Sequence, residues 1–175
     1  MILQPDDYDF GKSSNYSFAN DLTCKNDETR KMFVLAYGHM LNYNHEEAIS
    51  CFQKCTELDP DCAMAWWGIA YCLSSNYNWT PGLGSGHDPI QQAVSLVNNV
   101  TELERDLINA LAKRHSEEAR DAADPSVLNM GNSPELNIAF ADAMAPLYEK
   151  YEGNLDVTAI YVEALMNLKA WQLWD

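Results

Sequence analysis

The sequence contains four histidines, the side chains best suited to bind a metal or transfer a proton: His39, His45, His87 and His115. No two of them are three or four residues apart, the spacing that places two ligands on one helix face. A zinc site requires three or four converging ligands. His45 precedes Glu46 and Glu47 at a predicted helix start, where carboxylates stabilise the helix dipole. We therefore interpret His45 as structural and keep a metal site with His45 and His87 as the alternative.

The five cysteines are an odd set without CxxC spacing: Cys24, Cys51, Cys55, Cys62 and Cys72. Such a set favours free buried thiols over a disulfide framework. Cys51 and Cys55 are one helical turn apart, which a metal could use, but a buried apolar role is the favoured interpretation.

Other cofactor patterns are missing from the sequence. The segment GLGSG at 82–86 lacks both the preceding strand and the lysine of a phosphate-binding loop. The acidic residues form no ExxH pair of the kind found in di-iron bundles. We predict no cofactor and identify no catalytic residue.

The charge excludes two classes of partner. The 26 acidic and 11 basic residues give a formal net charge of −15, whereas nucleic acids and anionic membranes attract basic surfaces. No segment approaches the roughly 18 apolar residues of a membrane span, and the N-terminus MILQPDDYDF has no signal-peptide pattern. We expect a cytoplasmic protein that binds neither nucleic acid nor membrane, and a basic partner is compatible with the charge.

The apolar pattern predicts an all-α protein. Residues 1–26 have no sustained period and are expected to form an extended arm, followed by a helical repeat domain over 27–175. Helix starts are indicated by Asn26 or Asp27, by Thr101 with Glu104 as a capping box, and by Pro134. Apolar periodicity predicts helices at about 27–42, 45–58, 62–73, 90–98, 102–115, 134–151 and 155–170. The helix at 134–151 is expected to bury Ile138, Ala141, Met144, Ala145 and Tyr148, and Pro146 within it predicts a kink.

The first two long helices form an antiparallel hairpin, because only the short turn 42–44 connects them. Ala48, Phe52 and Cys55 lie on one face of the second helix, at positions i, i+4 and i+7. Pro60 then ends this unit, since proline disfavours helix in the residue before it.

These positions resemble the tetratricopeptide repeat (TPR). The small-and-large pattern of this repeat is matched by Leu35 and Ala36 on the first helix and by Ala48, Phe52 and Cys55 on the second, with Pro60 in the closing turn. The next unit begins thirty-four residues later, where Trp66, Ile69 and Ala70 take the places of Met32, Leu35 and Ala36. In such a pair a small residue lets the helices approach while the large one fills the gap. The resemblance implies antiparallel hairpins stacked as a solenoid.

Two longer stretches extend the resemblance. NHEEAISCFQKCTELDPDCAMAWWGIAYCLSSNYN and YVEALMNLKAWQLWD are similar to the N-terminal part of a family of long, largely uncharacterised TPR proteins, over about residues 28–175. This similarity implies that the family's helical hairpins continue beyond the position of Asp175, so that the repeat domain here is incomplete at its C-terminus. The present sequence differs from the family at Ser74 and Ser75, where the family usually has Gly-Pro.

The second unit is interrupted by residues 74–89, rich in glycine and proline, where a regular repeat has a tight turn. An insertion of this length in a compact helical array is often functional. We expect a TPR-like scaffold whose concave face and 74–89 loop bind a protein or peptide, either the missing C-terminal repeats or another subunit. The candidate partner-binding residues are Asn76, Tyr77, Asn78, Trp79, His87, Trp171 and Trp174.

A competing hypothesis is a metal-dependent enzyme or metal-binding protein. In this interpretation the matched segments Asn44-His45-Glu46 and Asn76-Tyr77-Asn78 meet at one end of neighbouring hairpins, and His87 adds a further polar group. Whether the chain is an enzyme is left open by the sequence.

Overall fold

The computed structural model describes residues 18–78, 85–115 and 134–172. These residues form helices and their connections, which confirms the all-α prediction. The α-helices are α1 (Phe18–Asp21), α2 (Asp27–Leu41), α3 (His45–Leu58), α4 (Ala63–Leu73), α5 (His87–Ser95), α6 (Glu102–Arg114), α9 (Pro134–Lys150) and α10 (Leu155–Met166), and the short 3₁₀ helices are η2 (Val97–Asn99) and η3 (Asn167–Lys169).

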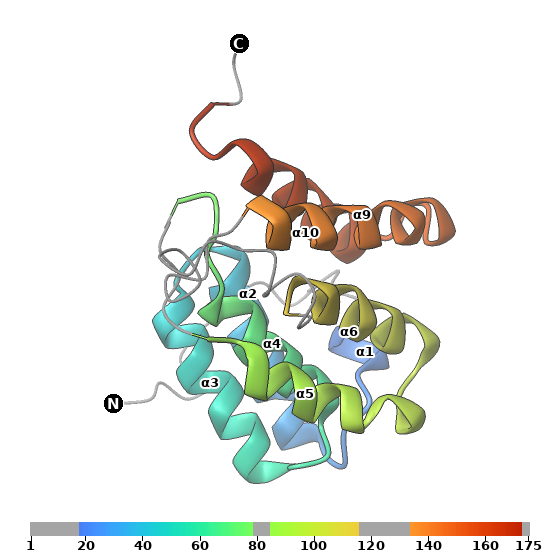
Figure 1. Cartoon of the computed structure of the whole chain (residues 1–175). Coiled ribbons are helices and arrows are strands. Elements are labelled where there is room, and N and C mark those ends of the chain that lie inside the picture. The colour runs from blue at the N-terminus through green and yellow to red at the C-terminus, as the bar shows by residue number, and fades with distance from the viewer. Residues whose placement is uncertain (1–17, 79–84, 116–133, 173–175) are drawn as a thin grey trace.

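Among the described residues, each long helix packs against the following one, from α2 on α3 through α6 on α9 to α9 on α10, and α4 also contacts both α2 and α6. Figure 1 shows α9 and α10 as a pair lying across the end of the group formed by α1 to α6. Within the described ranges, no helix is long and apolar enough to cross a membrane.

The helix starts confirm the capping predictions. The Asn26 side chain accepts a hydrogen bond from the Thr29 backbone at the start of α2. Thr101 and Glu104 form a complete capping box on α6, in which each side chain bonds the other residue's backbone. Glu104 is also buried and accepts a 2.7 Å bond from the Thr23 backbone, so the same carboxylate holds the segment before α2 against α6.

The core is built on aromatic rings from α1 to α4. Phe33 contacts Phe18, Tyr37 and Phe52, with ring centroids 5.3 to 6.0 Å apart. The fully buried Trp67 donates from its indole nitrogen to the Leu107 carbonyl, which joins α4 to α6. Four of the five cysteines are buried, all five are free thiols, and Cys24 is partly exposed, in agreement with the prediction of unpaired thiols.

Three sequence predictions need correction. The 1–26 segment contains the short helix α1, whose Phe18 is buried beneath Phe33 and Tyr37. Helix α5 begins at His87 rather than Ile90, because residues on both sides of Pro89 adopt helix and proline is well tolerated in a first turn. On α9, Ile138 and Tyr148 are 49% and 45% exposed. The buried stripe of α9 keeps the predicted Ala141 and Met144 and is completed by Leu136, Asn137 and Phe140.

Candidate functional site

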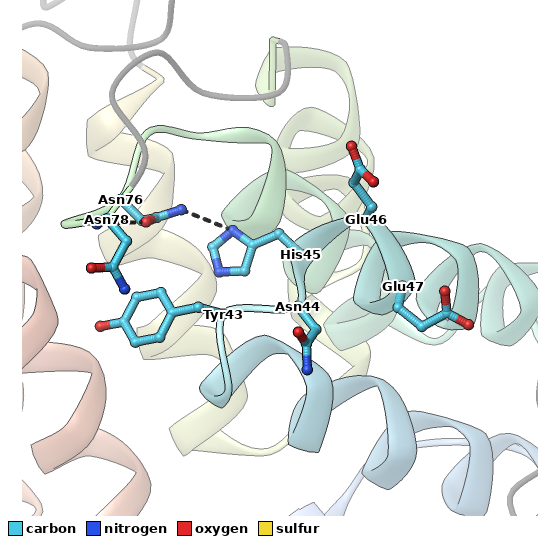
Figure 2. A pocket seen from close by; sticks show the side chains of 7 residues that line it. All are labelled: Tyr43, Asn44, His45, Glu46, Glu47, Asn76 and Asn78. Carbon is cyan, nitrogen blue, oxygen red and sulfur yellow. Dashed lines mark hydrogen bonds between the residues drawn. The ribbon is translucent and has the colours of Figure 1, made fainter.

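A pocket of about 450 Å³ opens where the turn between α2 and α3 meets the segment that follows α4. Its described lining residues are Tyr43, Asn44, His45, Glu46, Glu47, Asn76 and Asn78. Figure 2 shows the His45 ring between Asn76 and Tyr43, with Glu46 and Glu47 extending along the first turn of α3. The predicted meeting of the Asn44 and Asn76 segments is therefore present in the structure.

The turn that builds this pocket is tight. Tyr43 has a φ of 59°, in the left-handed region that few non-glycine residues adopt. The Asn44 backbone nitrogen bonds back to the His39 carbonyl at 2.9 Å, and the Tyr43 nitrogen to the Met40 carbonyl at 3.0 Å. These bonds reverse the chain within three residues, so His45 begins α3 directly beside the end of α2.

His45 is held by Asn76. Its Nδ1 lies 3.2 Å from the Asn76 Nδ2, and since an amide nitrogen can only donate, Nδ1 is the acceptor and the proton lies on Nε2. The Asn76 Oδ1 accepts from the Asn78 backbone at 2.9 Å, which fixes the segment after α4. His45 is 5% exposed, and its Nε2 is buried without a hydrogen bond.

The His45 imidazole is neutral at physiological pH. Burial lowers its pKa; the nearby carbonyls of Cys72 and Met40 oppose this effect in part, and the Arg114 charge adds to it. Tyr43 has its ring centroid 5.9 Å from that of His45, and burial, with Glu163 nearby, raises the pKa of its phenol to about 12. Both rings therefore contribute neutral, polar walls to the pocket.

A buried polar network lies behind the pocket. Arg114, 2% exposed, donates from Nη2 to the Ser75 carbonyl and to Asn137 Oδ1, both at 2.7 Å. Glu163 is 8% exposed, its pKa is raised by burial, and the Tyr71 hydroxyl and the Arg114 charge both stabilise its ionised form. This network joins the ends of α4, α6, α9 and α10.

Sequence reasoning missed Tyr43, Glu47, Arg114 and Glu163. Arg114 lies at i+3 from Leu111 and i+7 from Leu107, in register with the buried stripe of α6. A charged residue in an apolar register is a detectable signal of a buried ion pair, and the sequence interpretation did not use it. Glu163 shows the same signal on α10, three residues after the buried Ile160.

The predicted partner-binding residues fall into several groups. Asn76 and Asn78 line the pocket, and Tyr77 between them stacks on Trp171 with ring centroids 5.2 Å apart. His87 lies at the start of α5, 3.1 Å from the Asp88 carboxylate. Trp79 and Trp174 lie outside the described residues.

His45 and His87, the residues of the alternative metal-site hypothesis, are not part of a set of converging metal ligands in the described structure. His45 is engaged with Asn76, and His87 with Asp88. Across residues 18–78, 85–115 and 134–172, no group of three or more His, Cys, Asp or Glu side chains has an arrangement suited to a metal ion.

The described residues thus form a helical protein with a hydrogen-bonded polar pocket at the start of α3. No protein-family model, no curated protein and no solved structure matches this chain.

Proposed function

We propose that this chain is a TPR-like helical solenoid that binds a protein partner through α10 and the adjoining segment 74–78. The sequential packing of α2 to α10 supports a stack of antiparallel hairpins, and the thirty-four-residue return of the apolar pattern supports TPR-like units. In such an array each hairpin buries its apolar face on the next one.

One observation carries the proposal, the apolar character of the exposed side of α10. Its two carboxylates, Asp156 and Glu163, are 2% and 8% exposed. Three of its apolar side chains are exposed, at 65% for Leu155, 47% for Val162 and 43% for Leu165, while Val157, Ile160 and Ala164 are buried. The solvent-facing side of a helix normally carries polar and charged residues. We call the exposed residues Leu155, Val162, Leu165, Leu168 and Trp171 the α10 face.

The α10 face is continuous with part of the predicted binding loop. Trp171 is 68% exposed, yet one side of its ring stacks on Tyr77. A half-stacked, exposed tryptophan is a typical anchor in protein interfaces, where Trp and Tyr dominate the binding energy. The stack therefore extends the α10 face onto the segment after α4.

We infer that the partner is the same face of another subunit. The five residues of the α10 face are uncharged, and the exposed Lys169 is the charged residue between Leu168 and Trp171, so two copies can bring their apolar side chains together across a twofold axis. The remaining surface of each copy repels the other, because the chain carries a net charge of −15. Salt screens such long-range repulsion and should strengthen the association.

Sedimentation velocity over a range of protein concentrations tests this proposal. The unmodified chain should sediment as a concentration-dependent dimer, more so at high salt. The Val162→Lys/Leu165→Lys variant should sediment as a monomer with unchanged helix content. Gln91→Lys/Gln92→Lys is the matched control, since it adds the same charge at two exposed positions of α5 and should dimerise like the unmodified chain. A strictly monomeric unmodified chain would contradict the proposal.

A further inference from the structure

The pocket at the start of α3 and the α10 face are joined by consecutive residues of the segment after α4. Asn76 lines the pocket, and its Nδ2 donates to the His45 Nδ1 at 3.2 Å. Tyr77, the next residue, stacks on Trp171 of the α10 face, with ring centroids 5.2 Å apart and an angle of 23° between the rings. Because no residue separates the two contacts, the same short stretch of backbone positions both.

Two further interactions restrict Tyr77. The Asn76 Oδ1 accepts a 2.9 Å hydrogen bond from the Asn78 backbone nitrogen, which closes a turn with Tyr77 at its centre. Tyr77 also lies near Tyr43 on the pocket wall, where burial, followed by Glu163 and Tyr77, raises the pKa of the Tyr43 phenol to about 12. A movement of the Tyr77 side chain therefore affects two lining residues of the pocket, Asn76 and Tyr43.

Trp171 is the member of this connection that a second subunit can contact. Its side chain is 68% exposed although one face of the ring is stacked. Its φ of 63° lies in the left-handed region, which is unfavourable for residues other than glycine. This backbone cost opposes the stacked arrangement. A contact that favours the stack can therefore shift the balance between stacked and unstacked states.

We propose that the α10 face and the pocket are coupled, so that a second subunit covering Trp171 fixes the Trp171–Tyr77 stack and thereby strengthens the Asn76–His45 hydrogen bond. The inference rests on the proposed dimer for the contact that covers Trp171, whereas the connection from Trp171 to His45 lies within one subunit. An element with two states that both sites bias is the physical basis of such coupling. By linkage, whatever orders the pocket also favours the dimer.

The tautomer of His45 reports the state of the pocket. Because the Asn76 amide nitrogen donates to Nδ1, the ring proton is on Nε2, and loss of this bond removes the donor that keeps Nδ1 unprotonated. Long-range ¹H–¹⁵N NMR spectra distinguish a protonated from an unprotonated ring nitrogen. Hydrogen exchange of the Asn78 backbone amide, which bonds to the Asn76 Oδ1, provides a second measurement.

The connection within one subunit is tested in the Val162→Lys/Leu165→Lys background, which the proposed function predicts to be monomeric. Adding Trp171→Ala should reduce the share of the Nε2–H tautomer and accelerate exchange of the Asn78 amide about twofold or more. Trp171→Phe, which keeps an aromatic ring for the stack, should restore both values. Leu168→Ala is the matched control, because it truncates an exposed residue of the same face outside the stack, and it should change neither value. Circular dichroism verifies that the variants keep their helix content.

The effect of the second subunit is tested in the unmodified chain. Raising the protein concentration through the monomer–dimer transition should slow exchange of the Asn78 amide about twofold or more. A dimer whose Asn78 exchange is independent of concentration, or equal values for Trp171→Ala and Leu168→Ala, would overturn the coupling. A chain that stays monomeric yet responds to Trp171→Ala would support the connection within the subunit, overturn the dimer as its trigger and contradict the proposed function.

Discussion

Arg114 and Asn137 are joined by a 2.7 Å hydrogen bond from the guanidinium Nη2 to the amide Oδ1. The bond connects the last residue of α6 with the first turn of α9, and both side chains are buried. The Asn137 Nδ2 in turn donates to the Asn167 carbonyl at 3.2 Å, which reaches η3 after α10. A short chain of polar contacts thus fixes the α9–α10 pair against the rest of the protein.

Replacing Arg114 should therefore be costly. Arg114→Met removes a buried cation and leaves the Glu163 carboxyl without its charge partner, so we expect a loss of about 3–5 kcal/mol in the free energy of unfolding. Urea denaturation measures this loss. Lys113→Met is the neighbouring control, since Lys113 is exposed, and it should change stability by about 0.5 kcal/mol or less. Equal effects of the two substitutions would show that the network adds nothing to the fold.

Gly68 should not tolerate a side chain. A Cβ at this position would overlap the ring of Phe52, which is fully buried between α3 and α4. We expect Gly68→Ala to destabilise the protein by about 1–3 kcal/mol through overpacking. Gly68→Ala should cost less stability when it is added to Phe52→Leu than when it is added to the unmodified chain, because the smaller leucine side chain leaves room for the Cβ. Thermal unfolding of the three variants measures the coupling, and additive effects would contradict the close contact.

Stability should fall below neutral pH because of His115. Its Nε2 lies 3.2 Å from the Ser74 hydroxyl, and burial, with Arg114 and His87 nearby, lowers its pKa to about 3. The unfolded chain therefore binds a proton near pH 6.5 that the folded protein does not, and stability is lost as the pH falls from about 6.5 towards 3. Between pH 7 and pH 5 this one group should account for about 1–2 kcal/mol.

The His115→Asn variant isolates this contribution. Its stability relative to the unmodified chain should improve by the same amount between pH 7 and pH 5, as measured by urea denaturation. The raised pKa of Glu163 acts with the opposite sign, but it is present in both proteins and cancels in the comparison. A difference that does not change with pH would mean that His115 has the same pKa in the folded and unfolded states.

The sequence was sufficient for the elements whose causes are local. The capping box at Thr101 and Glu104 and the stop at Pro60 lie within a few residues of the helix ends they determine. It was insufficient where a distant contact decides the outcome. Phe18 forms part of a helix because its ring packs on Phe33 and Tyr37, and no pattern within residues 1–26 contains those partners.

The candidate pocket was only partly predictable for the same reason. His45 and Asn76 were recognised as polar groups at matching hairpin ends, and they do form a hydrogen bond. Tyr43 was not recognised, because its left-handed backbone conformation depends on the two bonds that close the turn before α3. The exposed α10 face was also unexpected in detail, since periodicity identifies an apolar stripe without showing which side is covered.

The most direct test of the proposed function is to measure the solvent accessibility of the α10 face as the protein concentration rises. Hydroxyl-radical footprinting reports the oxidation rate of individual side chains, and Trp171 and Leu165 are the exposed reporters. Trp66 is the internal control, because it is partly exposed on α4 and donates to the Pro60 carbonyl away from this face. The proposal predicts that oxidation of Trp171 and Leu165 slows with concentration while that of Trp66 stays constant. Unchanged oxidation of all three side chains would contradict it.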